Sequence, residues 1–350
     1  MLVNLLLHAL ALLISFYVLS IVADEFFVPS LEQIAKKFKM SSEVAGATIM
    51  AVGSSAPELF TAIFAVLKAK EAIDIGAGTI VGSAIFNILV IIGVSSLYTK
   101  AKLAWQPVIR DLVFYAISIL ALLFAFYDGN INLLESLGLI LLYVVYIFVV
   151  KNWSKWLNYK NIEEEIEKEI EKIEQSNLIG KTIKCAINSI IPKKNMIGQF
   201  TISVFFIGLF SAMLVESGVN IAHTLGVSNA IIGLTVLAAG TSIPDLLSSI
   251  IVAKKGKGDM AISNAVGSNI FDILLGLGLP YLLFFFINGI KSKIPIDTQN
   301  LLASVFLLFA TIIAILAVLI VRKWRIGKKA GWGLIILYAF YIIYSIYKVV

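Results

Sequence analysis

Ten apolar runs, each about as long as a bilayer-spanning helix, constrain this chain more than any other feature of its sequence. A helix needs about 20 apolar residues to cross the hydrocarbon core, where all its backbone hydrogen bonds must be made internally. With 59% hydrophobic and 14% charged residues, a soluble globular chain is excluded. We therefore expect an all-α membrane protein with ten transmembrane helices. The expected spans are 2–22, 43–67, 75–98, 108–127, 131–150, 197–222, 230–253, 259–287, 300–321 and 330–349.

The basic residues predict how these helices are oriented. With the N-terminus outside, 23 of the 28 Lys and Arg residues fall on the inner side, in agreement with the positive-inside rule. The prediction is a multi-pass protein of the cell membrane with both termini extracellular. Basic residues that follow the inner loops indicate topology, not nucleic-acid binding. The expected partners are membrane lipid and metal ions carried as substrates, with no obligate protein partner evident.

A cytoplasmic connection at 151–196 separates two five-helix halves, 1–150 and 197–350. Its segment 162–174 reads IEEEIEKEIEKIE, with isoleucines along one helical stripe. This pattern predicts a short, solvated amphipathic helix. A calcium-sensing or partner-binding helix is the alternative.

The two halves carry matching motifs. GATIMAVGSSAPE at 46–58 matches GLTVLAAGTSIPD at 233–245, and GSAIFN at 82–87 matches GSNIFD at 267–272. Because five is an odd number, the second half must enter the membrane upside down relative to the first. Inverted repeats with interrupted helices at matching positions are typical of secondary transporters.

Three carboxylates, those of Glu58, Asp245 and Asp272, stand inside apolar segments, where a charge is costly and is rarely kept without a function. Thr241 precedes Asp245 by four residues, and Ser268 precedes Asp272 by four. Residues at this spacing share a helix face. We therefore expect each pair to direct two oxygens to one point.

Further oxygens are expected around these acids. Proline removes a helical hydrogen bond and frees the carbonyl four residues back, so Pro57 and Pro244 predict exposed carbonyls at membrane depth. Additional side-chain oxygens come from Ser54, Ser55, Ser242, Ser83 and Asn87. All are hard oxygens of the kind that Ca²⁺ prefers. A helix-packing face would explain the glycines and serines but not the acids, and a proton relay remains an alternative to an ion site.

These motifs resemble the paired alpha-repeats of the cation/calcium exchanger superfamily, and in detail those of potassium-dependent sodium/calcium exchangers. The resemblance covers roughly half of the chain, with the first alpha-repeat at about 43–95 and the second at about 230–280. In the first half it runs through VAGATIMAVGSSAPELFTA and GTIVGSAIFNILVIIG. In the second it runs through IIGLTVLAAGTSIPD and NAVGSNIFDI.

The resemblance implies a ten-helix exchanger whose repeats meet at the membrane midplane. The central calcium-binding acids of the family fall on Glu58 and Asp245, and the position associated with potassium dependence falls on Asp272, whose neutral counterpart is Asn87. The flanking oxygen ligands fall on Ser54, Ser55, Thr241, Ser242, Ser83 and Ser268, with backbone carbonyls near Ala51 and Ala238.

The function expected from this resemblance is antiport of sodium against calcium, with potassium carried together with calcium, by alternating access. The ions are substrates, and no cofactor is expected. Calcium/proton exchange and potassium-independent sodium/calcium exchange are the alternatives. A cation channel lacks support because the chain has no carbonyl-lined filter sequence. Matches to intramembrane protease motifs at Asp128 and Asp259 fall on opposite sides of the predicted bilayer, so their acids cannot share a proton and no enzyme is expected.

Overall fold

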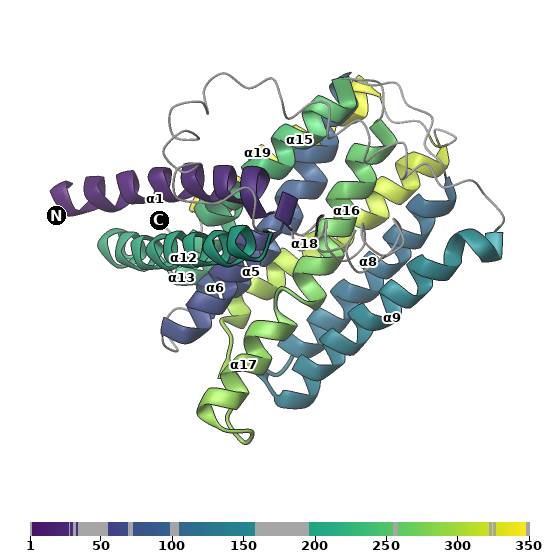
Figure 1. Ribbon diagram of the computed structural model, residues 1–350. Coiled ribbons are helices and arrows are strands. Elements are labelled where there is room, and N and C mark those ends of the chain that lie inside the picture. The colour runs from purple at the N-terminus through teal and green to yellow at the C-terminus, as the bar shows by residue number, and fades with distance from the viewer. Residues whose placement is uncertain are drawn as a thin grey trace.

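The computed structural model describes residues 2–27, 29–30, 33, 55–68, 73–98, 105–157, 196–254, 258–321, 324 and 327–347. The predicted helix at 162–174, the predicted ligands Ser54 and Ala51, and most of the first motif lie outside these residues. Apart from one small sheet, the described chain is helical throughout (Figure 1). Within it, seven helices are long and apolar enough to cross a membrane, so the prediction of an all-α membrane protein is confirmed at that level.

The first half forms helices close to the predicted spans. They are α1 (Leu2–Val22) with the π-helical turn η1 (Ala23–Phe27), α5 (Ala56–Lys68), α6 (Ile73–Phe86), η4 (Asn87–Ile91), α7 (Ile92–Tyr98), α8 (Trp105–Phe126) and α9 (Leu133–Leu157). The segment from α6 through η4 to α7 is one span of 26 residues. Every residue of α6 except Asp74 is buried, so this helix lies at the centre of the fold.

The second half contains more interruptions. Its elements are α12 (Met196–Leu225), α13 (Asn229–Ile232), η6 (Gly233–Leu237), α14 (Ala238–Thr241), α15 (Ile243–Lys254), α16 (Gly258–Leu274), α17 (Gly278–Asn288), α18 (Thr298–Val321) and α19 (Lys328–Tyr347). The predicted span 230–253 is interrupted at Ser242, next to Pro244, as proline in this segment predicts. The predicted span 259–287 agrees with an apolar membrane-spanning segment at Asn264–Asn288, within which a turn at 275–277 separates α16 from α17.

Glycines bring the central helix α6 against the second half. A Cβ atom at Gly78 would lie 2.6 Å from the carbonyl oxygen of Ala230, and one at Gly233 would lie 2.6 Å from that of Ile75. A Cβ at Gly82 would overlap the Leu234 carbonyl. Absence of side chains at these positions lets the two backbones approach, as is usual where membrane helices pack closely. The contact places the end of α6 beside the interruption at Ser242.

Helices α1 and α12 lie side by side (Figure 1) and pack in an apolar cluster that also includes residues of α5, α6, α13 and η6. The larger apolar cluster surrounds α6, α8 and α16. The pair reaches the repeat region through Phe16, because a Cβ at Gly240 would overlap the Phe16 ring. The ring of an α1 residue therefore packs on the glycine just before the interruption.

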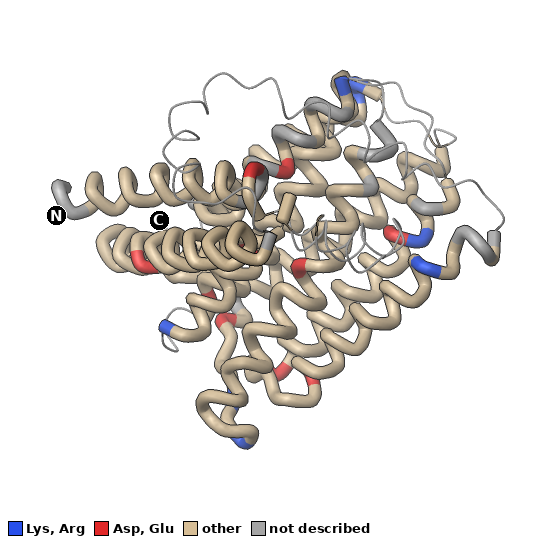
Figure 2. The backbone as a smooth tube through the Cα atoms, viewed as in Figure 1, with Lys and Arg blue, Asp and Glu red and all other residues tan. Residues whose placement is uncertain are grey.

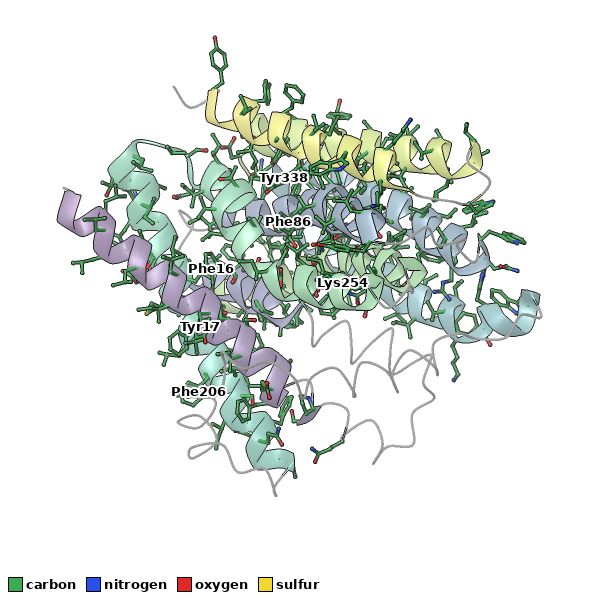
Figure 3. All side chains as sticks on the ribbon, turned by 90° about the horizontal axis from the view of Figure 1, so that it is seen from above. Phe16, Tyr17, Phe86, Phe206, Lys254 and Tyr338 are labelled. Carbon is green, nitrogen blue, oxygen red and sulfur yellow. The ribbon has the colours of Figure 1, made fainter. Side chains whose placement is uncertain are left out.

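Helix α19 covers the opposite flank (Figure 3). The Phe86 and Tyr338 rings meet edge to face with centroids 5.5 Å apart, and glycines at Gly93 and Gly331 bring α7 and α19 into backbone contact. This packing holds α19 along η4 and α7. The π-helical turn η4, which begins at Asn87, is therefore covered by α19 on this flank.

A short antiparallel sheet joins connections from the two halves. Strand β1 (Asn130–Ile131) pairs with β2 (Ile294–Pro295), with Asn130 opposite Pro295 and Ile131 opposite Ile294. The backbone N–H of Asp297 also donates to the Asp74 carboxylate at 2.9 Å. The connections after α8 and α17 and the start of α6 therefore share one end of the molecule.

Helices α5 and α15 point to opposite ends of the 73–98 span. Lys68 ends α5 only five residues before Ile73, so the chain can separate these two residues by at most about 18 Å. The Lys254 ammonium, at the end of α15, lies 5.0 Å from the Tyr98 ring centroid. Since the 26-residue span is about 39 Å long, α5 and α15 run in opposite senses.

Candidate ion-binding site

The two motif helices start in the same way. The N–H of Leu59 donates to the Ser55 carbonyl at 3.0 Å, and the N–H of Leu246 donates to the Ser242 carbonyl at 3.0 Å. Each motif proline occupies the second residue of its helix, where its missing N–H removes no helical bond. The acid follows in the first turn: Glu58 in α5 and Asp245 in α15. A helix N-terminus stabilises a negative charge, so both carboxylates have electrostatic support from their own helices.

Glu58 lies at the junction of the halves and is 1% exposed. Its Oε1 accepts hydrogen bonds from Ser242 at 3.3 Å and, at a longer 3.5 Å, from Ser83. The two hydroxyls are 2.6 Å apart. Thr241 also lies beside this carboxylate. Glu58 therefore collects hydroxyls from α6 and from the interruption between α14 and α15, while its Oε2 has no hydrogen-bond partner among the described residues.

Asp272 lies near the end of α16 and is fully buried. Neither carboxylate oxygen has a hydrogen-bond partner among the described residues. The Ser55 hydroxyl is a neighbour but does not reach hydrogen-bonding geometry. The charges of Glu58 and Asp245 also act on this carboxylate. Buried acceptors without partners are costly, which marks Asp272 as a position kept for something other than stability.

Asn87 is the first residue of the π-helical turn η4 and is also fully buried. Its Nδ2 donates to Asn269 Oδ1 at 2.9 Å, whereas its own Oδ1 has no partner within the described chain. Asn269 lies three residues before Asp272 on α16. The first half thus places a second unpartnered oxygen in the region of Asp272.

The remaining predicted ligands are distributed as follows. Asp245 and Ser268 are buried, and Ser268 shares α16 with Asp272 as the four-residue spacing predicts. The predicted helix face for Thr241 and Asp245 is wrong, because the helix is interrupted between them at Ser242. Thr241 donates to its own helix at Leu237 O, 3.1 Å away. The Ala238 carbonyl accepts from the N–H of Ser242 at 3.2 Å, so in this conformation its oxygen belongs to the helix.

The acids approach one another without meeting at one point. Figure 2 shows that Lys, Arg, Asp and Glu are sparse along the described helices. Among the described residues, no three Asp, Glu, His or Cys side chains gather closely enough to hold one metal ion. The described side chains in this conformation therefore offer an ion fewer than three carboxylates, together with neutral oxygens from hydroxyls and amides.

Two polar residues near the site were not predicted. Asn269 donates to the Ala84 carbonyl at 3.1 Å and to the Tyr115 hydroxyl at 2.8 Å. The sequence did contain a signal for Asn269, since it is the amide of the GSNIFD motif and stands one helical turn before Asp272. For Tyr115, an aromatic residue in an apolar helix is ordinarily core, so the sequence contained no signal.

Comparison with protein families matches residues 8–151 and 195–347 to the family described as sodium/calcium exchanger protein. This chain belongs to that family. Among its relatives, the sodium/potassium/calcium exchanger 4 of Mus musculus is 29% identical over 97% of this chain and 81% of its own length. The sodium/potassium/calcium exchanger 3 of Homo sapiens is 29% identical, with 97% and 80% coverage. Exchanger 2 of Gallus gallus is 28% identical, with 97% and 77% coverage.

Solved exchanger structures share the fold. The sodium-calcium exchanger NCX_Mj superposes with a TM-score of 0.58 at 24% identity, covering 97% of this exchanger and 99% of NCX_Mj. The H⁺/Ca²⁺ exchanger CAX gives a TM-score of 0.68 at 15% identity, covering 99% and 86%. Family membership confirms the prediction of a multi-pass membrane transporter whose ions are substrates, and it makes this chain an exchanger rather than an enzyme or a channel.

Proposed function

We propose that this exchanger moves sodium in one direction and calcium in the other, with potassium accompanying calcium. The observation that carries the proposal is the placement of buried acids from both halves, Glu58 and Asp245, in the first turns of oppositely directed helices. The oxygens of Asp272 and Asn87 that have no hydrogen-bond partner in the described part of the chain supply further acceptors nearby. The names of the sodium/potassium/calcium exchanger relatives support the choice of ions.

The proposed architecture is ten transmembrane helices in two inverted five-helix repeats, residues 1–150 and 197–350, joined by the 151–196 cytoplasmic connection. The opposite senses of α5 and α15 support inversion, as do the matched bonds at Ser55 and Ser242. The pairing of β1 with β2 brings the connections after α8 and α17 to one end of the molecule. This agrees with the proposal that both connections lie on the outer side. Both termini are proposed to be extracellular, on the basis of the basic residues.

In the proposed mechanism, calcium and sodium compete for one charged region. Glu58, Asp245 and Asp272 supply up to three negative charges, which one calcium ion with potassium, or several sodium ions, neutralise in turn. Uncompensated charges resist transfer through the apolar phase. Only occupied forms therefore change the side to which the site opens, and this requirement couples the two fluxes. The proposed ligand set also includes Ser54, Ser55, Thr241, Ser242, Ser83, Ser268, Asn87 and the carbonyls of Ala51 and Ala238.

Two other couplings remain as competing outcomes of the test. Calcium/proton exchange is favoured by the fold likeness to CAX, because carboxylates can release calcium to protons. Potassium-independent sodium/calcium exchange is favoured by the likeness to NCX_Mj. The three couplings differ in which ion gradient drives calcium transport and in whether potassium is needed.

The test is ⁴⁵Ca²⁺ uptake into proteoliposomes in which sodium, potassium and pH gradients are varied separately. We expect uptake to require an outward sodium gradient and to be stimulated by potassium. Uptake driven by a pH gradient without sodium would establish proton coupling, and full uptake without potassium would establish the potassium-independent form. Flux without any counter-ion would contradict exchange altogether.

Substitutions then test the site itself. Glu58→Gln and Asp245→Asn remove one negative charge each with little change of shape, and we expect either to abolish sodium-driven uptake. Asp128→Asn is the matched control, because Asp128 caps an exposed turn by accepting from the N–H of Asn130 at 3.0 Å. Sodium-driven uptake that survives Glu58→Gln or Asp245→Asn at the level of the control would refute the proposed site.

A further inference from the structure

Tyr115 of α8 is fully buried at the end of a chain of amide hydrogen bonds that leads to the site. Its hydroxyl accepts from Asn269 Nδ2 at 2.8 Å, and the same nitrogen donates to the Ala84 carbonyl at 3.1 Å. Asn269 Oδ1 in turn accepts from Asn87 Nδ2 at 2.9 Å. Tyr115 lies outside both repeat motifs, so its hydroxyl joins a third element to them.

The direction of this chain follows from the Ala84 carbonyl, which can only accept. Asn269 must therefore turn its amide nitrogen toward Ala84 and its oxygen toward Asn87. Because that oxygen can only accept, Asn87 must present its own nitrogen to Asn269. Its remaining atom, Oδ1, is the one that stays buried without a hydrogen-bond partner among the described residues. An amide has one donating and one accepting end, and only the accepting end can bind a cation.

The hydroxyl of Tyr115 holds Asn269 in this arrangement. The amide nitrogen of Asn269 has two hydrogens, and Tyr115 and Ala84 accept one each. Without the phenol oxygen, one buried N–H would lose its acceptor, which is costly. Rotation of the Asn269 side chain toward another acceptor would then be favoured. That rotation would remove the acceptor that fixes the orientation of Asn87. Asn269 stands three residues before Asp272 on α16, on the same face of the helix, which places this chain beside the acid.

We infer that Tyr115 is a positioning residue for cation binding, which acts through Asn269 to keep the Asn87 oxygen directed at the ion. The inference rests on the proposed function, since it needs Asn87 as a ligand. It adds a residue from α8 to a site otherwise built from the two repeats.

Tyr115→Phe removes only the hydroxyl and is the decisive variant. We expect the Kd for Ca²⁺, measured by equilibrium dialysis of ⁴⁵Ca²⁺ with the detergent-solubilised full chain, to rise about three- to tenfold, as expected for loss of one buried neutral hydrogen bond. The KM for Ca²⁺ in proteoliposome uptake should rise equally, with the maximal rate unchanged. Tyr281→Phe is the matched control: it is buried, but its hydroxyl has no hydrogen-bond partner among the described residues, so its Kd should stay within twofold of wild type.

A second pair of variants tests whether Tyr115 acts through Asn269. Asn269→Leu keeps the size of the side chain and removes the whole chain of bonds, so we expect a larger rise in Kd. The double variant Tyr115→Phe with Asn269→Leu should then bind Ca²⁺ as Asn269→Leu alone does, because residues that act in series are not additive. A further threefold loss in the double variant would overturn the inference.

An unchanged Kd in Tyr115→Phe would also overturn it, as would a loss of maximal rate with an unchanged Kd. These outcomes are separate from failure of the proposed function. A wild-type protein that binds Ca²⁺ in dialysis but shows no sodium-driven uptake would refute the function while leaving the Kd comparison valid.

Discussion

Asn87 and Asp272 occupy matching positions of the two repeat motifs but lie in different backbone settings. The helix through Asn87 continues by way of a π-helical turn into α7. The helix that carries Asp272 ends at Leu274, and a new helix begins at Gly278. The amide nitrogen of Asn87 is hydrogen-bonded, while neither carboxylate oxygen of Asp272 has a partner within the part of the chain that the structure describes. The fold therefore holds the neutral Asn87 side chain in place and leaves the charged Asp272 side chain available for binding.

Glycine explains the difference in the backbone. Four residues after Asn87 stands Ile91, whereas four residues after Asp272 stands Gly276. The N–H groups of both Leu275 and Gly276 converge on the Phe271 carbonyl, at 2.8 and 2.9 Å, and a Cβ at Gly276 would lie 2.5 Å from the Asp272 carbonyl oxygen. A residue with a side chain could not adopt this turn without moving Asp272. Duplication of a motif has thus been followed by divergence in both charge and helix continuity.

Asp272→Asn should have the largest effect, because it makes both matching positions neutral. We expect stimulation of calcium uptake by potassium to disappear, since the site loses the charge assigned to potassium, while sodium-driven exchange remains. The measurement is ⁴⁵Ca²⁺ uptake with and without potassium in proteoliposomes. A potassium response equal to that of wild type would show that the difference between Asn87 and Asp272 has no bearing on potassium.

Asn87→Asp instead makes both matching positions acidic. The new carboxylate cannot donate to Asn269 Oδ1, so two acceptors would face each other in a buried position. We expect the free energy of unfolding without ions to fall by about 1–3 kcal/mol. Added Ca²⁺ should recover more stability in this variant than in wild type, because ligand binding to the folded state stabilises it. Thermal unfolding in detergent with and without Ca²⁺ measures both effects, and an Asn87→Asp protein as stable as wild type without ions would contradict the role of the amide bond.

Gly276→Ala tests the backbone side of the comparison. The added methyl would press on the backbone of Asp272, and such overpacking costs about 1–3 kcal/mol. We expect a lower unfolding temperature together with a higher KM for Ca²⁺, since the carboxylate is displaced. Gly138→Ala on α9 is the control, because a Cβ there meets no described atom within 4 Å. Equal behaviour of the two alanine variants would show that the turn after Asp272 accommodates a side chain.

Ser136→Ala should have the smallest effect. The Ser136 hydroxyl of α9 donates to the Gly278 carbonyl at 2.8 Å and so fixes the start of α17. Its loss should lower the free energy of unfolding by about 0.5–1.5 kcal/mol. The matched control is Ser118→Ala, since the buried Ser118 hydroxyl donates to the Phe114 carbonyl within its own helix. If chemical unfolding gives the same stability for both variants, the interruption does not depend on α9.

Most of the helices and the charged members of the candidate site could be predicted, because their physical signals are local. The length and apolarity of a segment such as α18 identify it as a membrane span. A carboxylate within an apolar run, such as that of Glu58, identifies a candidate site residue. The turn at 275–277 could not be predicted, since Gly276 reads as part of an apolar helix until its contacts are known. Nor could Tyr115, whose role depends on one hydroxyl meeting an amide from a distant segment.

The two-stranded sheet has a mechanical consequence for any change of access. Its bonds join backbone to backbone, so they fix the α8–α9 connection to the α17–α18 connection whatever side chains those loops carry. At that end, the four helices can be displaced only as a single body unless the sheet separates. Relative displacement of the α8–α9 pair against the α17–α18 pair at this end therefore requires the two strands to separate.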